Sequence, residues 1–446
     1  MIQTSEQTGI TMPDNMAVKH SEEKKCELRV ISTDTEFDAL EAQWNELLEQ
    51  SDVTIFQTFE WLNSWWKYFK KPDDQLHIVL FLDDDLPIGV APMFKRHFKL
   101  LGFRIVTQLQ FIGCGLSDYI DIIITKGYKE IVLTTFTEYI HSNEKSWDVF
   151  DIEGVNEFST VYKLLPDLLK KHGINVVAYR GNVCTQVAIS KQENDEKGIS
   201  TSYHFRRKWK KLQEKFNTSI VRYQDETDDI EAGVEAFARL HGERWRSLGY
   251  ASAFDDPHHR AFHVEFSKKF ARRGWLRLLF LTANDQRVAV SYTFNYRNHI
   301  YMYQCNAQGS EDVMKCSPGF LLRAIVMDEG RVEGMKLYDF LRGDEAYKYD
   351  GGKTTATTEW LLRGSPATLS GKTRFTLFLI FELLLKSRQR VQREVYAYRR
   401  FRITQQPSFW NTVCYAAGKM RELYSLVKGY VFRHSPFQKT QKELAT

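Results

Sequence analysis

The second half of the chain contains a strand, a Pro-Gly loop, a helix and another strand in direct succession. HIYMYQCNAQ (299–308) alternates apolar or aromatic residues with polar ones, which predicts a strand. A loop closed by Pro318 and Gly319 leads into FLLRAIVMDEGRVEG (320–334), whose apolar residues have helical spacing. MKLYDFLRG (335–343) is predicted to be the second strand. The first amides of such a helix lack intrahelical partners, so the order predicts an α/β unit with an anion site suited to a phosphate.

An equivalent order of elements occurs earlier in the chain. QLHIVLFLDDDLPIGVAPMFKRHF (75–98) and WLRLLFLTANDQRVAVSYTFNYRNH (275–299) each read as a strand, a polar turn with Asp, and a second strand. SWDVFDIEGV (146–155) similarly matches MKLYDFLRGD (335–344). The copies lie about 195 residues apart, so an internal duplication is the simplest explanation. We therefore predict two tandem α/β domains with mixed central sheets flanked by helices.

Local composition divides the chain further. We expect a disordered N-terminus at 1–26, an N-terminal domain at 27–190, a polar linker at 191–200, a C-terminal domain at 201–365 and a helical tail at 366–446. The aromatic run FQTFEWLNSWWKYF, which begins at Phe56, is predicted to pack in the core.

Charge is unevenly distributed, although the formal net charge of the 446 residues is only +4. Residues 386–446 contain thirteen Lys and Arg against three Asp and Glu, together with many aromatic residues. FTLFLIFELLL (375–385) precedes them and is too short to span a bilayer. The tail therefore either contacts an anionic membrane surface or packs as a helical layer on the domains. No recognisable reader motif accompanies this charge, so we expect no DNA binding.

The six cysteines form no C-x-x-C pair, which favours free thiols and predicts no metal site. The N-terminus has no apolar core of a secretory signal, and no run of 18 apolar residues occurs. We therefore expect a cytoplasmic protein, with peripheral contact at the inner face of the cell membrane as an option for its tail.

Several motifs resemble those of one enzyme family. SPGFLLRAIVMDEG and YDFLRGDEAYKYDGG resemble the "SPG-x-LL" and "DF-x-x-G-x-x-x-YK" signature of CelD/BcsL-type acetyltransferases, a branch of the GNAT superfamily. FQTFEWLNSWW, YHFRRKWKKL and LHGERW are also similar to strings of this family. The family's Trp-Gly pair after YK is replaced here by Asp350, Gly351 and Gly352, so the acceptor of relatives does not transfer to this chain.

This resemblance implies tandem GNAT-like domains and acetyl-CoA, or another acyl-CoA, as the cofactor. In that layout the pantetheine arm lies between two splayed strands, here 300–305 with Tyr303 and Cys305, and 335–341. The pyrophosphate is expected on the turn formed by Ser317, Gly319, Phe320 and Leu321. The basic cluster Arg206, Arg207, Lys208, Lys210 and Lys211 either faces water or steers anionic groups toward the site.

The candidate catalytic residues follow the second strand. Asp344 or Glu345 is expected to act as the base, Tyr347 to protonate the leaving thiolate, and Lys348 to stabilise the oxyanion. Candidates for substrate binding are Arg342, Asp339, His241, Arg244 and Asp118. Arg342 has an alternative role as the ion-pair partner of Asp339 or Asp344. Asp118 lies beside Gly113 and Gly115, a pair that only weakly matches a phosphate loop.

The resulting hypothesis is an acyl-CoA-dependent N- or O-acyltransferase that modifies a sugar, lipid-linked or amine acceptor, in surface polysaccharide biosynthesis. One alternative is a FemABX-like aminoacyl transferase that uses charged tRNA, since those enzymes also have a tandem GNAT fold. The other is an inactive GNAT-fold scaffold at the membrane.

Overall fold

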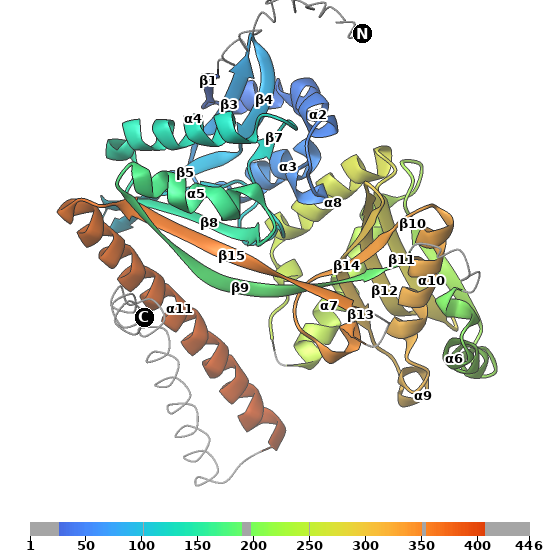
Figure 1. The fold of residues 1–446 in the computed structure, drawn as a ribbon. Helices are drawn as coiled ribbons and strands as arrows, with labels where there is room; N and C mark the ends of the chain where they lie inside the picture. The colour runs from blue at the N-terminus through green and yellow to red at the C-terminus, as the bar shows by residue number, and fades with distance from the viewer. Residues whose placement is uncertain (1–25, 101, 190–197, 249, 350–353, 406–446) are drawn as a thin grey trace, which may run out of the picture.

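The computed structural model describes residues 26–100, 102–189, 198–248, 250–349 and 354–405 (Figure 1). Within these residues, eleven strands form one sheet in the order β10-β11-β12-β13-β14-β9-β15-β8-β6-β5-β2. Their bounds are β2 Gln75–Leu76, β5 Met93–Leu100, β6 Phe103–Phe111, β8 Val149–Asn156, β9 Ile174–Ala188, β10 Thr218–Tyr223, β11 Leu276–Ala283, β12 Gln286–Tyr296, β13 His299–Ala307, β14 Leu337–Arg342 and β15 Thr354–Pro366. A smaller sheet contains β1 Glu27–Ile31, β3 Ile78–Asp83, β4 Leu86–Ala91 and β7 Ile123–Ile124.

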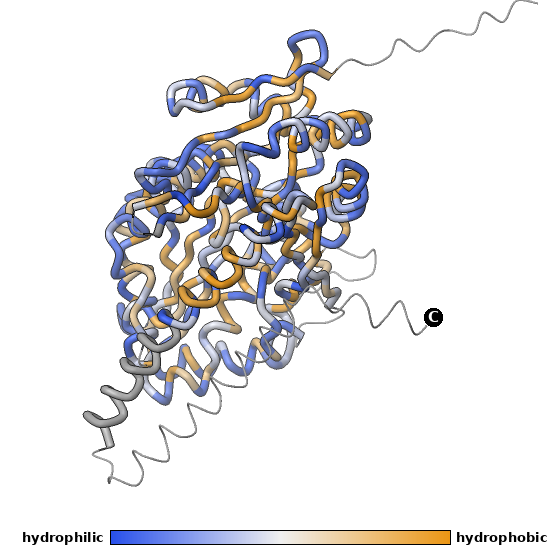
Figure 2. The backbone as a smooth tube through the Cα atoms, turned by 90° about the vertical axis from the view of Figure 1, so that its left-hand side faces the viewer, coloured by the Kyte–Doolittle hydropathy of each residue, from blue (hydrophilic) through white to orange (hydrophobic). Residues whose placement is uncertain are grey.

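Helices cover both faces of the large sheet. They are α1 Asp34–Asp38, α2 Glu41–Glu49, α3 Phe59–Phe69, α4 Lys129–Ser142, α5 Thr160–Lys171, α6 Tyr203–Gln213, α7 Ile230–Ser247, α8 Pro257–Arg272, α9 Glu311–Met314, α10 Pro318–Val332 and α11 Leu369–Gln405. In β11, Leu278 and Phe280 pack toward α7 and α8, whereas Leu279 and Leu281 pack toward α6 and α10. Because side chains alternate along a strand, a strand covered on both faces needs a continuous apolar sequence. In Figure 2 the hydrophobic segments accordingly lie mainly inside the molecule and the hydrophilic ones at its outer turns.

The two halves repeat the same local geometry, in agreement with the predicted duplication of one α/β unit. The β3–β4 hairpin turns at Asp84 and Asp85, with φ of 47° and 65°. The β11–β12 hairpin turns at Asn284 and Asp285, with φ of 48° and 62°. Two successive left-handed residues are typical of the tight hairpin turn that matches strand twist, and Asn and Asp tolerate this conformation. Each half also contains one parallel strand pair, β6–β8 and β13–β14.

The last strand of each half pairs with the other half. β9 is antiparallel to β14, with Leu337 opposite Ala188. β15 is antiparallel to β8, with Glu359 opposite Asn156, and also pairs with β9 along its length from Thr354 to Pro366. The domain ranges predicted from composition therefore share one sheet, and the chain crosses between the halves at β9 and β15. Most of the predicted linker, residues 191–197, lies outside the described residues, as does the predicted N-terminal segment up to residue 25.

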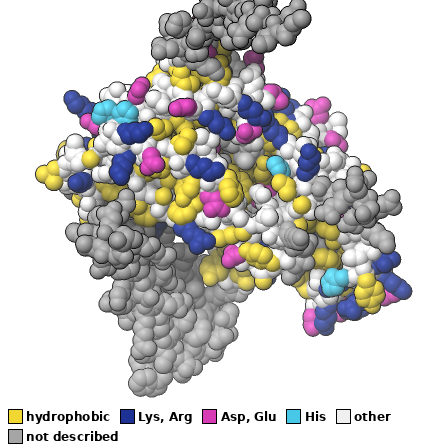
Figure 3. Space-filling view, viewed as in Figure 1, with side chains coloured by type: hydrophobic (Ala, Val, Ile, Leu, Met, Phe, Trp, Pro, Cys, Tyr) yellow, Lys and Arg dark blue, Asp and Glu magenta, His cyan; other side chains and the backbone are white. Residues whose placement is uncertain are grey.

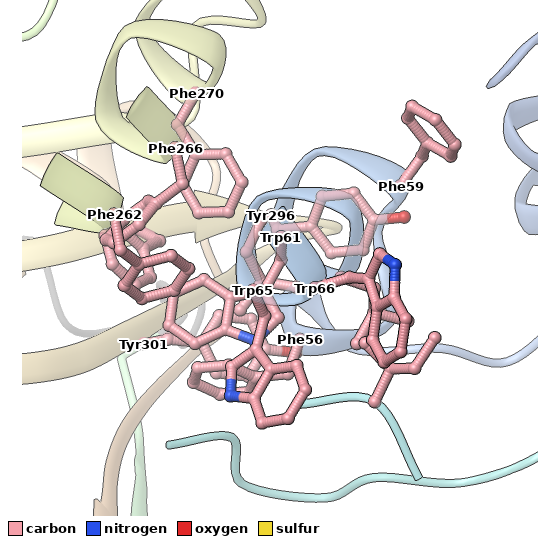
Figure 4. Close-up of a cluster of buried hydrophobic side chains, with 14 of the residues drawn as sticks. Phe56, Phe59, Trp61, Trp65, Trp66, Phe262, Phe266, Phe270, Tyr296 and Tyr301 are labelled. Atoms are coloured by element: carbon pink, nitrogen blue, oxygen red, sulfur yellow. The ribbon is translucent and has the colours of Figure 1, made fainter. Parts of the chain in front are cut away.

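An aromatic cluster joins the halves on one side of the sheet (Figure 4). Trp61 of α3 is fully buried, and its ring centroid lies 4.8 Å from Phe266 and 5.2 Å from Phe262, both on α8. Phe56, in the 3-10 turn before α3, contacts Tyr301 of β13 at 6.0 Å. The predicted core role of the aromatic run is confirmed, and the same residues also form the contact between the two halves.

Helix α11 packs on the N-terminal half of the sheet through its first turns. Phe378 is buried against Val106 and Val149, and Arg374 pairs with Asp148 at 2.6 Å. This packing agrees with the helical-layer interpretation for the start of the tail, whereas residues 406–446 lie outside the described residues. Among the described helices, none is long and apolar enough to cross a membrane.

Candidate functional site

Strands β13 and β14 form a fork. They are parallel at three residue pairs, namely His299 with Leu337, Ile300 with Tyr338 and Tyr301 with Asp339. Beyond this point β13 continues to Ala307 beside β12, whereas β14 continues beside β9. One backbone edge of β13 therefore has no strand partner within the described part of the chain, and an extended ligand arm can add to such an edge. Both predicted strands and their divergence are confirmed.

The turn before α10 lies past the end of β13. Ser317 has a left-handed φ of 54°, and Pro318 occupies the first helical turn. A Cβ atom at Gly319 would lie 3.3 Å from the Cβ atom of Ala307, so glycine permits this close approach. Leu321 N–H donates to Ser317 O at 3.2 Å, while no protein acceptor is recorded among the described residues for the amides of Gly319 and Phe320. These amides are therefore available for the predicted anion site, which stays a prediction.

The basic helix α6 lies next to this turn, a proximity that sequence spacing did not indicate. Lys208 Nζ donates to Ser317 Oγ at 2.8 Å. The rings of His204 and Phe205 contact Phe320 at 5.2 and 6.5 Å. Figure 3 shows Lys and Arg side chains gathered at the lower right, where Figure 1 places α6. A positive charge is thus held beside a helix N-terminus, and both favour an anion.

Tyr347 lies against β13 inside the fork. Its hydroxyl lies close to the Cys305 thiol. Arg323 of α10 lies over the Tyr347 ring, 5.2 Å from its centroid, and over the Phe340 ring at 5.6 Å. Burial, followed by the nearby Cys305 and Glu345, raises the pKa of the Tyr347 phenol. The phenol therefore keeps its proton at neutral pH, as a donor to a leaving thiolate must.

Lys348 points away from the fork and into the backbone. Its ammonium donates to the carbonyl oxygens of Phe340, Leu341, Arg342 and Gly343, at 3.2, 3.5, 2.9 and 3.2 Å. The side chain is 2% exposed and also pairs with Glu345 at 3.0 Å. Leu341, in the middle of this turn, has a strained left-handed φ of 56°. The contacts give Lys348 a positioning role, and an additional role as oxyanion donor stays a prediction.

The two expected bases lie at the surface. Asp344 accepts a hydrogen bond from the Tyr349 hydroxyl, and Glu345 faces Lys348. Both are exposed in the turn after β14. Their catalytic role stays a prediction, but the geometry favours a more enclosed carboxyl group as the base.

Arg342 pairs with Asp118 of the N-terminal half rather than with Asp339 or Asp344. It also donates to the carbonyl oxygen of Ser117. Glu359 of β15 lies in the same cluster, and burial raises its pKa to about 7. Asp118, Cys184 and Glu359 place their ligand atoms within 4.8 Å of one another, but the Arg342 guanidinium already supplies the cation there.

Asp339 is buried at the point where the fork opens. Its Oδ1 accepts from the Leu341 amide at 2.7 Å and from the Tyr119 hydroxyl at 3.2 Å, and its Oδ2 accepts from Gln186 Nε2 at 2.7 Å. Burial raises its pKa to about 7, although these three hydrogen bonds oppose that effect. Tyr119 and Gln186 belong to the N-terminal half, so both halves hold this carboxyl group.

A cavity of about 480 Å³ opens beside Asp339, between the two halves. Its lining comprises Asp52, Thr54, Gln57, Tyr119, Asp121, Ile122, Ile124, Lys129, Asn156, Phe158, Ser159, Thr160, Val161, Gln186, His299, Tyr301 and Asp339. Burial raises the pKa of Asp121 to about 7 as well. The cavity therefore bears carboxyl, phenol, amide and hydroxyl groups beside apolar side chains, the kind of lining that orients a substrate.

The side chains of three predicted site residues lie away from the fork and from the cavity. His241 bonds Ser252 Oγ at 2.8 Å among Phe237 and Phe254, and burial lowers its pKa to about 4. Arg244 is exposed on α7. The Tyr303 ring lies in the aromatic core, 5.5 Å from Trp61, so only its backbone faces the fork. No contact of His241 or Arg244 with the fork is recorded in the described part of the chain, and their roles stay predictions.

Several polar groups of the glycine-rich loop after β6 are hydrogen-bonded to other groups of the protein. Ser117 Oγ accepts from Trp61 Nε1 at 2.7 Å and donates to Gly113 O at 2.8 Å. The Gly115 amide donates to Glu153. These bonds lie within the N-terminal half, and Arg342 of the other half reaches the same loop at Ser117 and Asp118. The Gly113-x-Gly115 pattern singles out this loop in the sequence. No comparable pattern identifies Tyr119, Gln186, Glu359 or Phe158 as site residues.

Comparison with known proteins agrees with this geometry. Residues 200–349 match a family described as "Acetyltransferase (GNAT) domain". The match covers about a third of the chain, within the C-terminal half, and agrees with the predicted GNAT superfamily and acyltransferase class of enzyme. No curated protein matches the chain.

Solved structures are similar over about three quarters of this chain. A structure described as FemX superposes with a TM-score of 0.50 at 12% identity, covering 75% of this chain and 96% of FemX. A protein of unknown function from Bacteroides thetaiotaomicron gives 0.46 at 12% identity, covering 75% and 99% of the two chains. A tandem GNAT protein from the clavulanic acid biosynthesis pathway gives 0.40 at 10% identity, covering 77% and 99%. At 12% identity the likeness to FemX describes the fold alone.

Proposed function

We propose that the protein is an acyl-CoA-dependent N- or O-acyltransferase, with acetyl-CoA as donor and a sugar, lipid-linked or amine acceptor of surface polysaccharide biosynthesis. The observation that carries the proposal is the contact between Lys208 and Ser317 at the N-terminus of α10, directly past the fork of β13 and β14. A strand edge, free helix amides and a lysine ammonium match an extended arm that ends in a pyrophosphate.

In this arrangement the pantetheine arm of the donor adds to the free edge of β13 and its thioester reaches the fork. The attacking atom of the acceptor loses a proton and forms a bond to the thioester carbonyl. The carbon–sulfur bond then breaks, and the Tyr347 hydroxyl lies where it can protonate the departing thiolate.

Thermal unfolding with and without acetyl-CoA tests the donor site. A ligand that binds the folded state stabilises it by mass action, so the wild-type protein should unfold at higher temperature with millimolar acetyl-CoA. Lys208→Ala should weaken the binding by about 10-fold or more through loss of a charged contact. Lys210→Ala is the matched control, because Lys210 is 79% exposed on the same helix and pairs with Glu214. Equal shifts in both variants would contradict the proposed donor site.

Two other functions give different results in this assay. An aminoacyl transferase that uses charged tRNA would not respond to acetyl-CoA but would bind tRNA through the exposed face of α6, and Lys210→Ala would weaken that binding. An inactive scaffold would respond to neither ligand.

We further propose a cytoplasmic location with peripheral contact to an anionic membrane through α11. Leu377, Ile380 and Leu384 are 37%, 49% and 60% exposed. They recur at helical spacing, and a basic sequence follows them in the same helix. Sedimentation with vesicles that contain anionic lipid should carry down the wild-type protein but less of a variant with Ser at these three positions. Equal sedimentation would exclude this contact.

A further inference from the structure

The interdomain cavity ends where the donor fork begins. Tyr301 and Asp339 are the last paired residues of β13 and β14, and both also line the cavity. A group bound in the cavity beside Tyr301 and Asp339 is therefore adjacent to the place where β13 and β14 diverge. An acyl group at the apex of the fork and an acceptor in the cavity would meet at Asp339.

The polar groups of the cavity include opposing charges. Asp52, Asp121 and Asp339 contribute carboxyl groups. Lys129 lies 3.9 Å from Asp52, and the N-terminus of the 12-residue helix α5, with Ser159 as its cap, also belongs to the lining. One ammonium and one helix N-terminus partly offset these carboxyl groups, and burial raises the pKa of Asp121 and of Asp339 to about 7, so an uncharged ligand suits the cavity better than a free anion.

Hydrogen-bond donors and acceptors line the rest of the cavity wall. Gln57, Asn156 and Gln186 provide amide groups, and Thr54 and Thr160 provide hydroxyl groups. Phe158 also belongs to the lining and is 68% exposed, an uncommon position for a large aromatic side chain. A flat apolar ring beside many donors and acceptors matches a sugar, which has an apolar ring face and a hydroxyl periphery.

We propose that this cavity is the acceptor site, that it takes a polyhydroxylated sugar ring against Phe158, and that Asp339 is the base that deprotonates the attacking hydroxyl group. This inference rests on the proposed acyltransferase function and narrows its acceptor to a carbohydrate. The hydroxyl oxygen attacks the thioester carbonyl, its proton passes to Asp339, the carbon–sulfur bond breaks, and the departing thiolate takes a proton from Tyr347, which regains it when Asp339 is deprotonated again. The products are the sugar ester and the free thiol of coenzyme A, so atoms and charge balance.

The hydrogen bonds from Tyr119 and Gln186 give the N-terminal half a role in catalysis as well as in binding. They hold Oδ1 and Oδ2 of Asp339, so Tyr119 and Gln186 are positioning residues. The ionisable groups that face Asp339 are Tyr119 and Asp118 from the loop after β6, Cys184 from β9, and Tyr301 from β13, with His299 on the cavity wall. Asp118 is in turn paired with Arg342.

Thiol release from acetyl-CoA by the full chain tests the sugar site, with glucose, glucosamine and N-acetylglucosamine at millimolar concentration as probes. At least one sugar should accelerate release by the wild-type protein. Phe158→Ala should remove this acceleration without changing the thermal stabilisation by acetyl-CoA. Phe103→Ala is the matched control, because Phe103 is 75% exposed at the start of β6 and should leave both readouts unchanged.

The base is tested in the same assay. Asp339→Asn should slow sugar-dependent thiol release by about 100-fold or more, the usual contribution of a general base. Asp167→Asn, an exposed control on α5, should have no effect. Tyr119→Phe should raise the pH at which the rate is half-maximal while leaving the high-pH plateau, because the lost hydrogen bond stabilises the ionised carboxylate.

The outcomes separate the inference from the proposed function. Wild-type rates in Asp339→Asn, sugar acceleration that survives in Phe158→Ala, or acceleration by amines or peptides but no sugar would each overturn the inference while acetyl-CoA still stabilised the protein. If acetyl-CoA produced no stabilisation, the proposed donor would be wrong. Thermal stabilisation by a sugar that is lost in Phe158→Ala would then still support the cavity as a sugar site, and its absence would overturn it.

Discussion

At the scale of single residues, the roles of two side chains depend on neighbours that are distant in sequence. Lys348 and Asp339 both lie within the segment that most strongly indicated a transferase. Lys348 was expected to face the substrate, yet its ammonium contacts the carbonyl groups around Leu341. Asp339 was expected to bind the substrate, and Tyr119 and Gln186 hold it in place from the other half.

Lys348→Met should destabilise the protein, because four carbonyl groups and Glu345 would lose a buried charged donor. We expect a loss of about 1–3 kcal/mol in the free energy of unfolding, measured with urea. Lys336→Met, at an exposed position just before β14, is the control and should change it by less than about 0.5 kcal/mol. A Lys348→Met protein of unchanged stability that has lost activity would instead support a direct catalytic role.

Asp339 should make the stability depend on pH. Its folded pKa of about 7 lies above the value of an unfolded aspartate, so between these values the folded state keeps a proton that the unfolded state has released. This contribution is fully present below the unfolded pKa and is lost as pH rises through about 7. From pH about 5 to about 8.5, urea unfolding should therefore show wild type losing stability relative to Asp339→Asn, by roughly 1–3 kcal/mol. Parallel pH profiles would contradict this account.

At the scale of elements, α11 has two apolar faces of different kinds. Phe378 is 2% exposed and packs on the sheet, whereas the neighbouring Leu377 is 37% exposed. Arg363, buried on β15, bonds Asp151 and the α11 residue Glu382. The inner face therefore belongs to the folded protein, and the outer face, which is exposed in the part of the chain that the structure describes, carries the proposed membrane contact.

Phe378→Ala should cost about 3 kcal/mol in the free energy of unfolding, because it leaves a cavity between α11 and the sheet. Leu377→Ala, one residue away and partly exposed, is the matched control and should cost less than about 1 kcal/mol. Unfolding by urea compares the two. Equal small effects would mean that α11 does not pack on the sheet in solution.

At the scale of the whole molecule, the exchange of β9 and β15 makes the halves depend on each other. A fragment with residues 198–446 lacks β9, so β14 loses its antiparallel neighbour and β15 loses both of its partners. Unpaired strand edges aggregate readily.

We therefore expect the fragment 198–446 to be insoluble when produced alone and soluble when co-produced with fragment 1–197, with which it should elute as one complex in size-exclusion chromatography. A soluble 198–446 monomer that unfolds cooperatively at the temperature of the intact protein would show that the halves are independent.

The sequence by itself determined the local elements and the class of protein. Period-two alternation, the Pro-Gly start of α10 and the Asp-containing hairpin turns depend on neighbouring residues, so they predicted the strands, the helix, the duplication and the GNAT resemblance. Only the tertiary structure decided which distant groups meet, namely Lys208 with Ser317, Tyr119 with Asp339, and Arg342 with Asp118. Those contacts depend on the exchange of β9 and β15, and strand pairing between halves leaves no periodic signal in the strands that take part.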